Sequence, residues 1–204
     1  MLGWKPMFTG IIEAVGTLAE VKGTGGGYRV RIETPLAPQL KLGDSLAVNG
    51  VCLTAILIDG EHVMADVGPE TARVTTFGAL RRGQSVNLER PLRFDGRVDG
   101  HFVLGHVDGV GTVEDTRPEA ESHWLTIAFP TPLAAYFIRK GSIAVDGISL
   151  TVAGLGERQF DVQVVPYTWA QTTLKLLRVG DKVNLECDMI GKYVVREMEL
   201  RARG

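Results

Sequence analysis

The feature that most constrains the fold of this chain is an internal repeat. The octapeptide VNGVCLTA at residues 48–55 recurs as VDGISLTV at residues 145–152, which lie 97 positions later. The same spacing holds without a gap as far as GQSVNLE at 83–89 and its match GDKVNLE at 180–186. Upstream the spacing is 95, so that Gly10 matches Gly105. A period of this length is too long for a solenoid and indicates two domain-sized copies, roughly 7–96 and 97–189.

Two interpretations of the repeat remain open at this point. One is duplication for stability alone, and the other is a pair of related binding sites. The best-matched segments are turns and threonine-rich strand ends, and loops carry function more often than cores do. Cys52 in the first copy is replaced by Ser149 in the second. Two binding sites built on one scaffold would therefore differ at this position.

Within each copy, short stretches rich in Val, Ile, Leu and Thr alternate with glycine-containing turns. The pattern predicts β-strands joined by turns, and Asp59-Gly60 is a strong hairpin signal. Six strands in so short a unit favour a closed barrel, because closure removes exposed strand edges. We therefore predict an all-β fold of two tandem six-stranded antiparallel Greek-key-like barrels. The strands of the first copy are expected near 11–20, 28–33, 45–48, 52–58, 62–67 and 85–89, with a short helix or irregular crossover at 71–80.

The two ends of the chain fall outside the repeat. Residues 190–204 have no counterpart in the first copy and place Ile190, Val194 and Met198 at helical spacing. This spacing predicts an amphipathic C-terminal helix. The helix either folds back on its own domain or makes a subunit contact. Residues 1–6, MLGWKP, form an N-terminal extension.

Composition narrows the class of partner. The formal net charge is -2, so there is no basic surplus for a nucleic acid. No apolar run approaches the ~20 residues that span a bilayer, and the N-terminus lacks a signal-peptide core. We expect a cytoplasmic protein without membrane or nucleic-acid partners. Two cysteines and four scattered histidines show no standard ligand spacing, so no metal is expected.

Several motifs resemble one known family. MFTGIIE at 7–13, VNGVCLT at 48–54, GHFVLGHVDGVG at 100–111 and GISLTV at 147–152 are similar to the riboflavin synthase family (alpha chain, tandem lumazine-binding repeats). The resemblance runs from Met7 to about Glu197, and its motifs occur in the family's order. It implies a dismutation of two molecules of 6,7-dimethyl-8-ribityllumazine, in which one donates a four-carbon unit to the other. The products are riboflavin and 5-amino-6-ribitylamino-2,4-pyrimidinedione.

The resemblance also implies the assembly. Family members are homotrimers joined through C-terminal helices, and they use no metal or cofactor. The active site lies between the N-terminal barrel of one subunit and the C-terminal barrel of a neighbour. On this basis, His106 and Ser149 are expected to reach Cys52 of a neighbouring subunit. Association with lumazine synthase is a further partner that the resemblance suggests.

Six residues match the family's reacting positions. Cys52 would hydrogen-bond the pteridine or add to its C7 atom, although a lone cysteine is usually a buried hydrophobe. His106 would move a proton to or from the C7 methyl group, although many histidines only bond the backbone. The hydroxyls of Ser149 and Thr151 would polarise ring heteroatoms, or else bond locally in their strands. Ser45 and Asp146 rank below these four, and Cys187 is interpreted as structural.

Substrate-binding residues also follow from motif positions in the family. The first pocket is expected to use, besides Cys52, residues Gly10, Ile11, Ile12, Val51, Leu53, Asp66, Val67, Gly68, Pro69, Glu70 and Thr71. The second pocket is expected to use, besides His106, Ser149 and Thr151, residues Gly105, Val107, Lys140, Leu150, Val164, Val165, Pro166, Tyr167 and Thr168.

Departures from the family pattern keep a rival interpretation open. The extension 1–6 precedes the usual start at Met7, Asp99 replaces a frequent glycine, and Tyr167 replaces a frequent His or Glu. The rival is a non-catalytic lumazine- or flavin-binding fluorescent protein, which would lose reacting residues. A flavin-binding electron-transfer module would need an adjoining nucleotide-binding domain. The presence of all four main candidates favours the enzyme.

Overall fold

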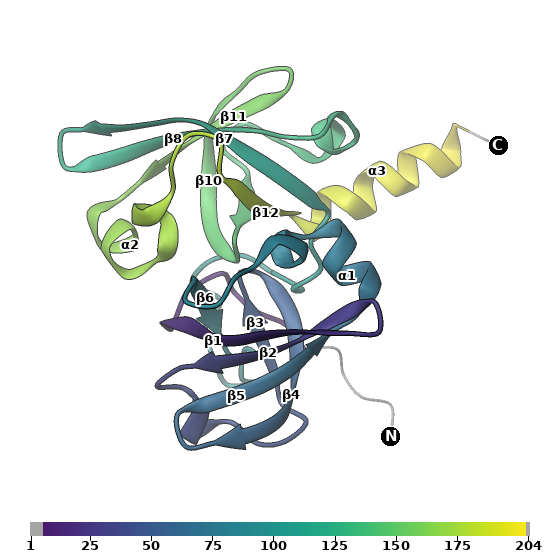
Figure 1. Ribbon diagram of the computed structural model, residues 1–204. Helices are drawn as coiled ribbons and strands as arrows, with labels where there is room; N and C mark the ends of the chain where they lie inside the picture. Colours follow the sequence, from purple (N-terminus) through teal and green to yellow (C-terminus); the bar gives the residue numbers. More distant parts are fainter. Residues whose placement is uncertain (1–5, 203–204) are drawn as a thin grey trace.

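The computed structural model describes residues 6–202 and contains two closed antiparallel barrels of six strands each. The barrels lie one above the other in Figure 1. The all-β fold with a C-terminal helix is therefore confirmed. Barrel 1 has the strand order β1-β2-β5-β4-β3-β6, and barrel 2 has the order β10-β11-β8-β7-β12-β9. The strands are β1 (Ala14–Thr24), β2 (Gly27–Glu33), β3 (Ser45–Val48), β4 (Val51–Asp59), β5 (His62–Val67), β6 (Ser85–Glu89), β7 (Gly109–Glu119), β8 (Ser122–Ala128), β9 (Ser142–Val145), β10 (Ile148–Leu155), β11 (Gln159–Val164) and β12 (Lys182–Cys187).

Alternation of side chains explains why these segments form barrels. In β2, Val30 and Ile32 are buried while their neighbours are exposed or half-buried, as expected for strands with one face toward a core. Each barrel encloses its own cluster of buried aliphatic and aromatic side chains. In β4 the inward residues Val51 and Leu53 flank Cys52, whose side chain therefore points out of the barrel. The same alternation puts Ser149 on the outside of barrel 2.

The first strand begins later than the sequence predicts, because the segment before it packs against the other repeat. Residues 7–12, the N-terminal arm, run beside residues 101–107, the central arm. Phe8 and Val103 exchange two backbone hydrogen bonds of 2.7 and 3.0 Å, and both side chains are buried between the barrels. Each arm then continues onto the barrel of the other repeat. Ile12 packs against the core of barrel 2, and Val107 packs against the core of barrel 1.

Matched asparagines join the two barrels. The Asn184 amide accepts a hydrogen bond from the Thr76 N–H and donates one to the Asn49 carbonyl, at 2.8 and 2.9 Å. Asn87 repeats both contacts toward barrel 2, on Thr173 and Asp146. Because buried amides need partners, these four bonds fix how one barrel sits on the other.

Each barrel has a short helix after its β5 or β11 strand, and a longer helix follows the last strand. Helix α1 (Pro69–Val74) and helix α2 (Pro166–Gln171) follow β5 and β11, and each begins with proline in its first turn. Helix α3 (Met189–Arg201) starts at the N-cap Asp188 and extends away from both barrels (Figure 1). Within residues 6–202, no helix is long and apolar enough to span a membrane. The predicted extension 1–6 lies almost wholly outside the described residues.

Candidate functional site

The first candidate site, called pocket 1 below, is the surface around Cys52 of β4. The Cys52 N–H donates to the Gly105 carbonyl of the central arm at 2.9 Å, so the arm lies directly on this strand. His106, the next residue, is exposed beside it. Continuing the β4–β5 register from Ala55↔Ala65 places Cys52 level with Gly68, where α1 begins. One chain thus brings together Cys52, His106 and the 66–71 segment.

Close packing explains why the central arm has glycine at this point. A Cβ atom on Gly105 would lie 2.6 Å from Cys52 Cβ, and the backbone φ is +75°. Both conditions exclude an L side chain without strain. The arm can therefore approach Cys52 only through its backbone.

The second candidate pocket repeats this arrangement around Ser149 of β10. The Ser149 N–H donates to the Gly10 carbonyl of the N-terminal arm at 2.8 Å, and Gly10 has a φ of +76°. Thr151 is exposed two residues further along the strand, and the β10–β11 register places Ser149 level with Val165. Gly10, Ser149, Thr151 and the 164–168 segment therefore surround one site on barrel 2.

The two arms are exchanged relative to the expected pockets. Gly10 was expected with Cys52, and Gly105 with Ser149, from motif positions in the family. The structure places Gly10 on Ser149 and Gly105 on Cys52. His106 consequently lies with Cys52 of its own chain, whereas we expected it to accompany Ser149. A sequence repeat reports which segments correspond, but it contains no information about which copy each segment packs on.

Cys52 and Ser149 have different polar neighbours. The Ser149 hydroxyl lies 2.7 Å from His101 Nδ1, and burial lowers the pKa of His101, so that its imidazole is neutral near pH 7. Cys52 has Ser45 as its hydrogen-bonding neighbour. Burial raises the pKa of the Cys52 thiol, the hydrogen bond with Ser45 acts to lower it, and the charge of Glu186 raises it further. Pocket 1 therefore presents a neutral thiol and pocket 2 presents a serine–histidine pair.

The flanking segments contribute side chains that range from buried to exposed. Asp66 forms an ion pair of 2.7 Å with Arg29, whose hydrogen bond lowers the pKa of the carboxyl, and Glu70 pairs with Arg73. Lys140 is exposed at a φ of +67°. The remaining predicted contacts divide by burial: Val51, Leu53, Val67, Leu150 and Val164 are buried, Ile12, Thr71, Val107 and Thr168 are half-buried, and Ile11, Gly68, Pro69, Val165, Pro166 and Tyr167 are exposed.

Asp146 lies apart from these side chains, in the contact between the barrels. Its carboxyl accepts a hydrogen bond of 2.8 Å from the Asn184 N–H and is fully buried. Burial raises the pKa of Asp146 to about 7. Asn49 occupies the matched position in barrel 1 and accepts the same bond from Asn87. Both residues line a groove of about 540 Å³ between the barrels.

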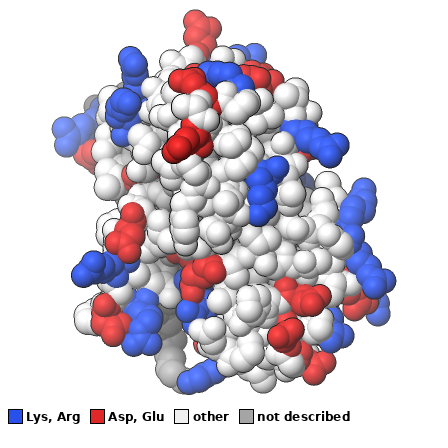
Figure 2. Space-filling model, turned by 90° about the vertical axis from the view of Figure 1, so that its left-hand side faces the viewer, with Lys and Arg blue, Asp and Glu red and all other residues white. Residues whose placement is uncertain are grey.

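Sequence reasoning missed three polar residues that contact the arms or the reacting positions: His101, Glu89 and Glu186. His101 could have been recognised as the first histidine of GHFVLGH, and the two glutamates could have been recognised as the ends of the repeated VNLE segments. Among residues 6–202, no three His, Cys, Asp or Glu side chains are grouped to hold a metal ion. Figure 2 shows positive and negative side chains interspersed on one face of the molecule.

Comparison with known proteins agrees with the geometry. The family model for the lumazine binding domain matches twice, at residues 9–91 and 104–188. A riboflavin synthase of Bacillus amyloliquefaciens is 43% identical over 193 residues, which cover 93% of this chain and 89% of the relative. This chain belongs to the riboflavin synthase family. A riboflavin synthase of Mycobacterium tuberculosis is 44% identical and covers 94% of this chain, with 98% of the relative matched.

Solved structures show the same architecture. The crystal structure of LumP complexed with riboflavin superimposes with a TM-score of 0.83 at 25% identity, covering 88% of this chain and 98% of LumP. The complex of LumP with 6,7-dimethyl-8-(1'-D-ribityl) lumazine has a TM-score of 0.80 at 26% identity. The two matches to the lumazine binding domain correspond to the two barrels.

Proposed function

We propose that this protein is a riboflavin synthase that converts two molecules of 6,7-dimethyl-8-ribityllumazine into riboflavin and 5-amino-6-ribitylamino-2,4-pyrimidinedione. The observation that carries the proposal is the pair of matched pockets with different reacting groups, a thiol in one and a serine–histidine pair in the other. Two barrels of the same architecture can each bind one of the two identical substrate molecules. Different reacting groups suit their different roles as donor and acceptor of the four-carbon unit.

The proposed roles follow from the protonation of each group. Cys52 is a neutral thiol near pH 7, which favours hydrogen bonding to the pteridine over attack as a thiolate. His106 is exposed on the central arm, where it exchanges a proton with the C7 methyl group. Ser149, held by neutral His101, polarises a ring heteroatom of the second molecule, and Thr151 assists it.

The direct test is turnover without added cofactor. Purified protein is incubated with 6,7-dimethyl-8-ribityllumazine, and riboflavin is followed by its absorbance. One riboflavin for every two lumazine molecules consumed is the expected result. Binding with a fluorescence change but no riboflavin would identify a ligand carrier. The likeness to LumP in its riboflavin and lumazine complexes makes that carrier the second candidate.

The active assembly is proposed to be a homotrimer in which pocket 1 of one subunit faces pocket 2 of its neighbour. Helix α3 supports this proposal, because Ile190 and Met198 are 62% and 65% exposed on one stripe with Val194. The first turn of α3 is tied to barrel 2 by the ion pair of Lys192 with Asp108 at 2.6 Å. A cytoplasmic location and association with lumazine synthase stay predictions of the family resemblance.

Charge placed on the apolar stripe of α3 is expected to dissociate the trimer. The double variant Val194→Glu/Met198→Glu should sediment as a monomer and lose most activity, since ionised groups cannot stay buried unpaired in an interface. Arg196→Ala changes the opposite side of the helix and serves as the control. A double variant that sediments as a trimer would contradict the role assigned to α3.

A further inference from the structure

The repeated VNLE segments end in two buried glutamates that no proposed catalytic step uses. Glu89 in β6 and Glu186 in β12 are matched residues, and their exposed fractions are 4% and 3%. Carboxylates are rarely buried to this extent unless they are paired or hydrogen-bonded. Within residues 6–202, neither glutamate forms an ion pair. Their partners are instead backbone N–H groups of the two arms and the Thr9 hydroxyl.

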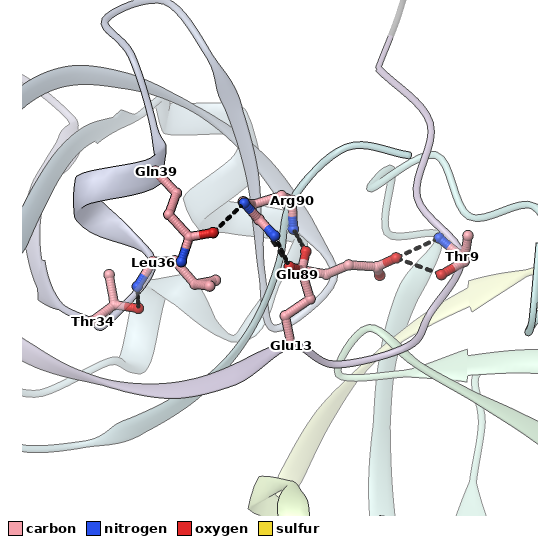
Figure 3. A network of polar contacts seen from close by, with 7 residues as sticks. All are labelled: Thr9, Glu13, Thr34, Leu36, Gln39, Glu89 and Arg90. Carbon is pink, nitrogen blue, oxygen red and sulfur yellow. Dashed lines mark hydrogen bonds and ion pairs between the residues drawn. The ribbon is translucent and has the colours of Figure 1, made fainter. Parts of the chain in front are cut away.

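Glu89 holds the N-terminal arm. Its carboxylate accepts hydrogen bonds from the Thr9 N–H at 2.6 Å, the Thr9 hydroxyl at 2.7 Å and the Gly10 N–H at 2.9 Å. Figure 3 shows the Glu89 side chain extending from its strand to Thr9. Burial raises the pKa of Glu89, and these three hydrogen bonds act to lower it. The carboxylate therefore connects barrel 1 to two successive residues of the arm.

Glu186 holds the central arm in the matched way. One carboxylate oxygen accepts from the Leu104 N–H at 2.6 Å, and the other accepts from the His106 N–H at 2.9 Å. The two bonds bracket Gly105, whose carbonyl accepts from Cys52. Burial raises the pKa of Glu186, while the two backbone bonds and the charge of Lys192 lower it.

Each glutamate thus lies in one barrel and acts on the pocket of the other. Glu89 belongs to barrel 1, and the arm that it holds places Gly10 on Ser149 of barrel 2. Glu186 belongs to barrel 2, and its arm places Gly105 and His106 beside Cys52 of barrel 1. Gly10 and His106, whose N–H groups the glutamates bind, themselves lie at the two pockets, so a displaced carboxylate moves the pocket wall directly.

We propose that Glu89 and Glu186 are positioning residues, each of which holds the arm that completes the ligand pocket of the opposite barrel. This inference rests on the proposed function, because it takes the pockets to bind lumazine and riboflavin. It predicts a crossed effect: a change in barrel 2 weakens the pocket of barrel 1, and a change in barrel 1 weakens the pocket of barrel 2.

Cys52 provides a reporter for one pocket alone. Iodoacetamide alkylates the thiolate of an accessible cysteine, so the labelling is done at alkaline pH, where a fraction of Cys52 is ionised. Riboflavin bound in pocket 1 should protect Cys52 from it. Cys187 does not compete, because it is 2% exposed and burial raises its pKa to about 12. The riboflavin concentration that halves the rate of Cys52 alkylation then measures the affinity of pocket 1.

Glu186→Gln should raise this half-protecting concentration about tenfold or more, since a hydrogen bond to a charged group contributes about 1.5–3 kcal/mol. The glutamine keeps the size of the side chain, but its NH₂ group faces one of the two N–H donors. Glu89→Gln is the matched control and should leave the protection of Cys52 unchanged. Glu186→Asp keeps the charge but is too short to reach both N–H groups, so it should reproduce the effect of Glu186→Gln.

Each outcome bears on the inference. Equal effects of the Glu186 and Glu89 variants, or no effect of either Glu186 variant, would overturn the crossed positioning role. Riboflavin that protects Cys52 at no concentration in the unchanged protein would overturn the pocket assignment on which this inference rests, whereas turnover of 6,7-dimethyl-8-ribityllumazine decides the proposed function. Unfolding midpoints within a few degrees of the unchanged protein establish that a shift in protection reflects the arm and not loss of the fold.

Discussion

Trimers mixed from two inactive variants should regain activity when the variants break different pockets. Cys52→Ala impairs pocket 1 and leaves pocket 2 intact, while Ser149→Ala does the reverse. If each active site combines pocket 1 of one subunit with pocket 2 of its neighbour, a random equal mixture contains intact pairings at about a quarter of its sites. We therefore expect about a quarter of the unchanged protein's activity after subunit exchange.

The exchanged arms supply a control for this experiment. His106 lies beside Cys52 in one chain, so His106→Ala and Cys52→Ala break the same pocket. Mixing these two variants should restore nothing, whereas mixing His106→Ala with Ser149→Ala should restore activity. The opposite pattern would return His106 to the pocket of Ser149, as the family resemblance suggested. Exchange is verified by mass spectrometry of differently tagged subunits.

Assayed separately, the Cys52→Ala and Ser149→Ala proteins must each lose most activity for the mixing experiment to be informative. Where Cys52→Ala stays active, Gly105→Val replaces it, since any Cβ atom at this position would lie 2.6 Å from Cys52 Cβ. No recovery in mixtures with proven exchange would contradict an active site shared between subunits.

Much of the fold was predictable because it depends on local patterns. Alternating strands, turn residues and the hairpin signal at Asp59-Gly60 each depend on a few neighbouring residues. The first strand was misplaced, to 11–20 in place of Ala14–Thr24, because the arm before it is also extended. An extended segment has the same pattern whether it joins its own barrel or crosses to another.

The candidate site was predictable where it coincides with motif positions and unpredictable where it depends on contacts between distant segments. Cys52 and Ser149 emerged as one of the positions at which two matched segments differ. His101 was not recognised, because its contact with Ser149 joins residues 48 positions apart. Glu186 was not recognised for the same reason, since it contacts the arm across about 80 residues.

Asp146→Asn is expected to stabilise the protein, and to do so more at pH 8 than at pH 5. The Asp146 pKa is raised by burial from 3.8 to about 7, so the folded state keeps its proton where the unfolded state has lost it. Below about pH 4 both states are protonated and the group has no effect on stability. As the pH rises from about 4 to about 7, the Asp146 carboxyl progressively lowers the free energy of unfolding, and above about pH 7 it lowers it no further. A shift of about 3 pKa units corresponds to a loss of up to about 4 kcal/mol at pH 8.

The matched position in barrel 1 indicates that asparagine fits at position 146. Asn49 is the matched residue, with a φ of 44° against 45° for Asp146, and it accepts the same backbone hydrogen bond. Asparagine at 146 should therefore keep the contact and remove the titration. The converse variant Asn49→Asp adds a second buried carboxyl and should lower stability at pH 8 by a similar amount.

Urea unfolding at pH 5 and pH 8 measures both variants against the unchanged protein. The free energy of unfolding of Asp146→Asn should exceed that of the unchanged protein by more at pH 8 than at pH 5. The free energy of unfolding of Asn49→Asp should fall below that of the unchanged protein by more at pH 8 than at pH 5. Parallel pH profiles for all three proteins would show that the Asp146 carboxyl does not carry a raised pKa. Activity of Asp146→Asn then separates the two roles of the residue: a carboxyl that only joins the barrels leaves turnover intact, whereas one that acts on the substrate does not.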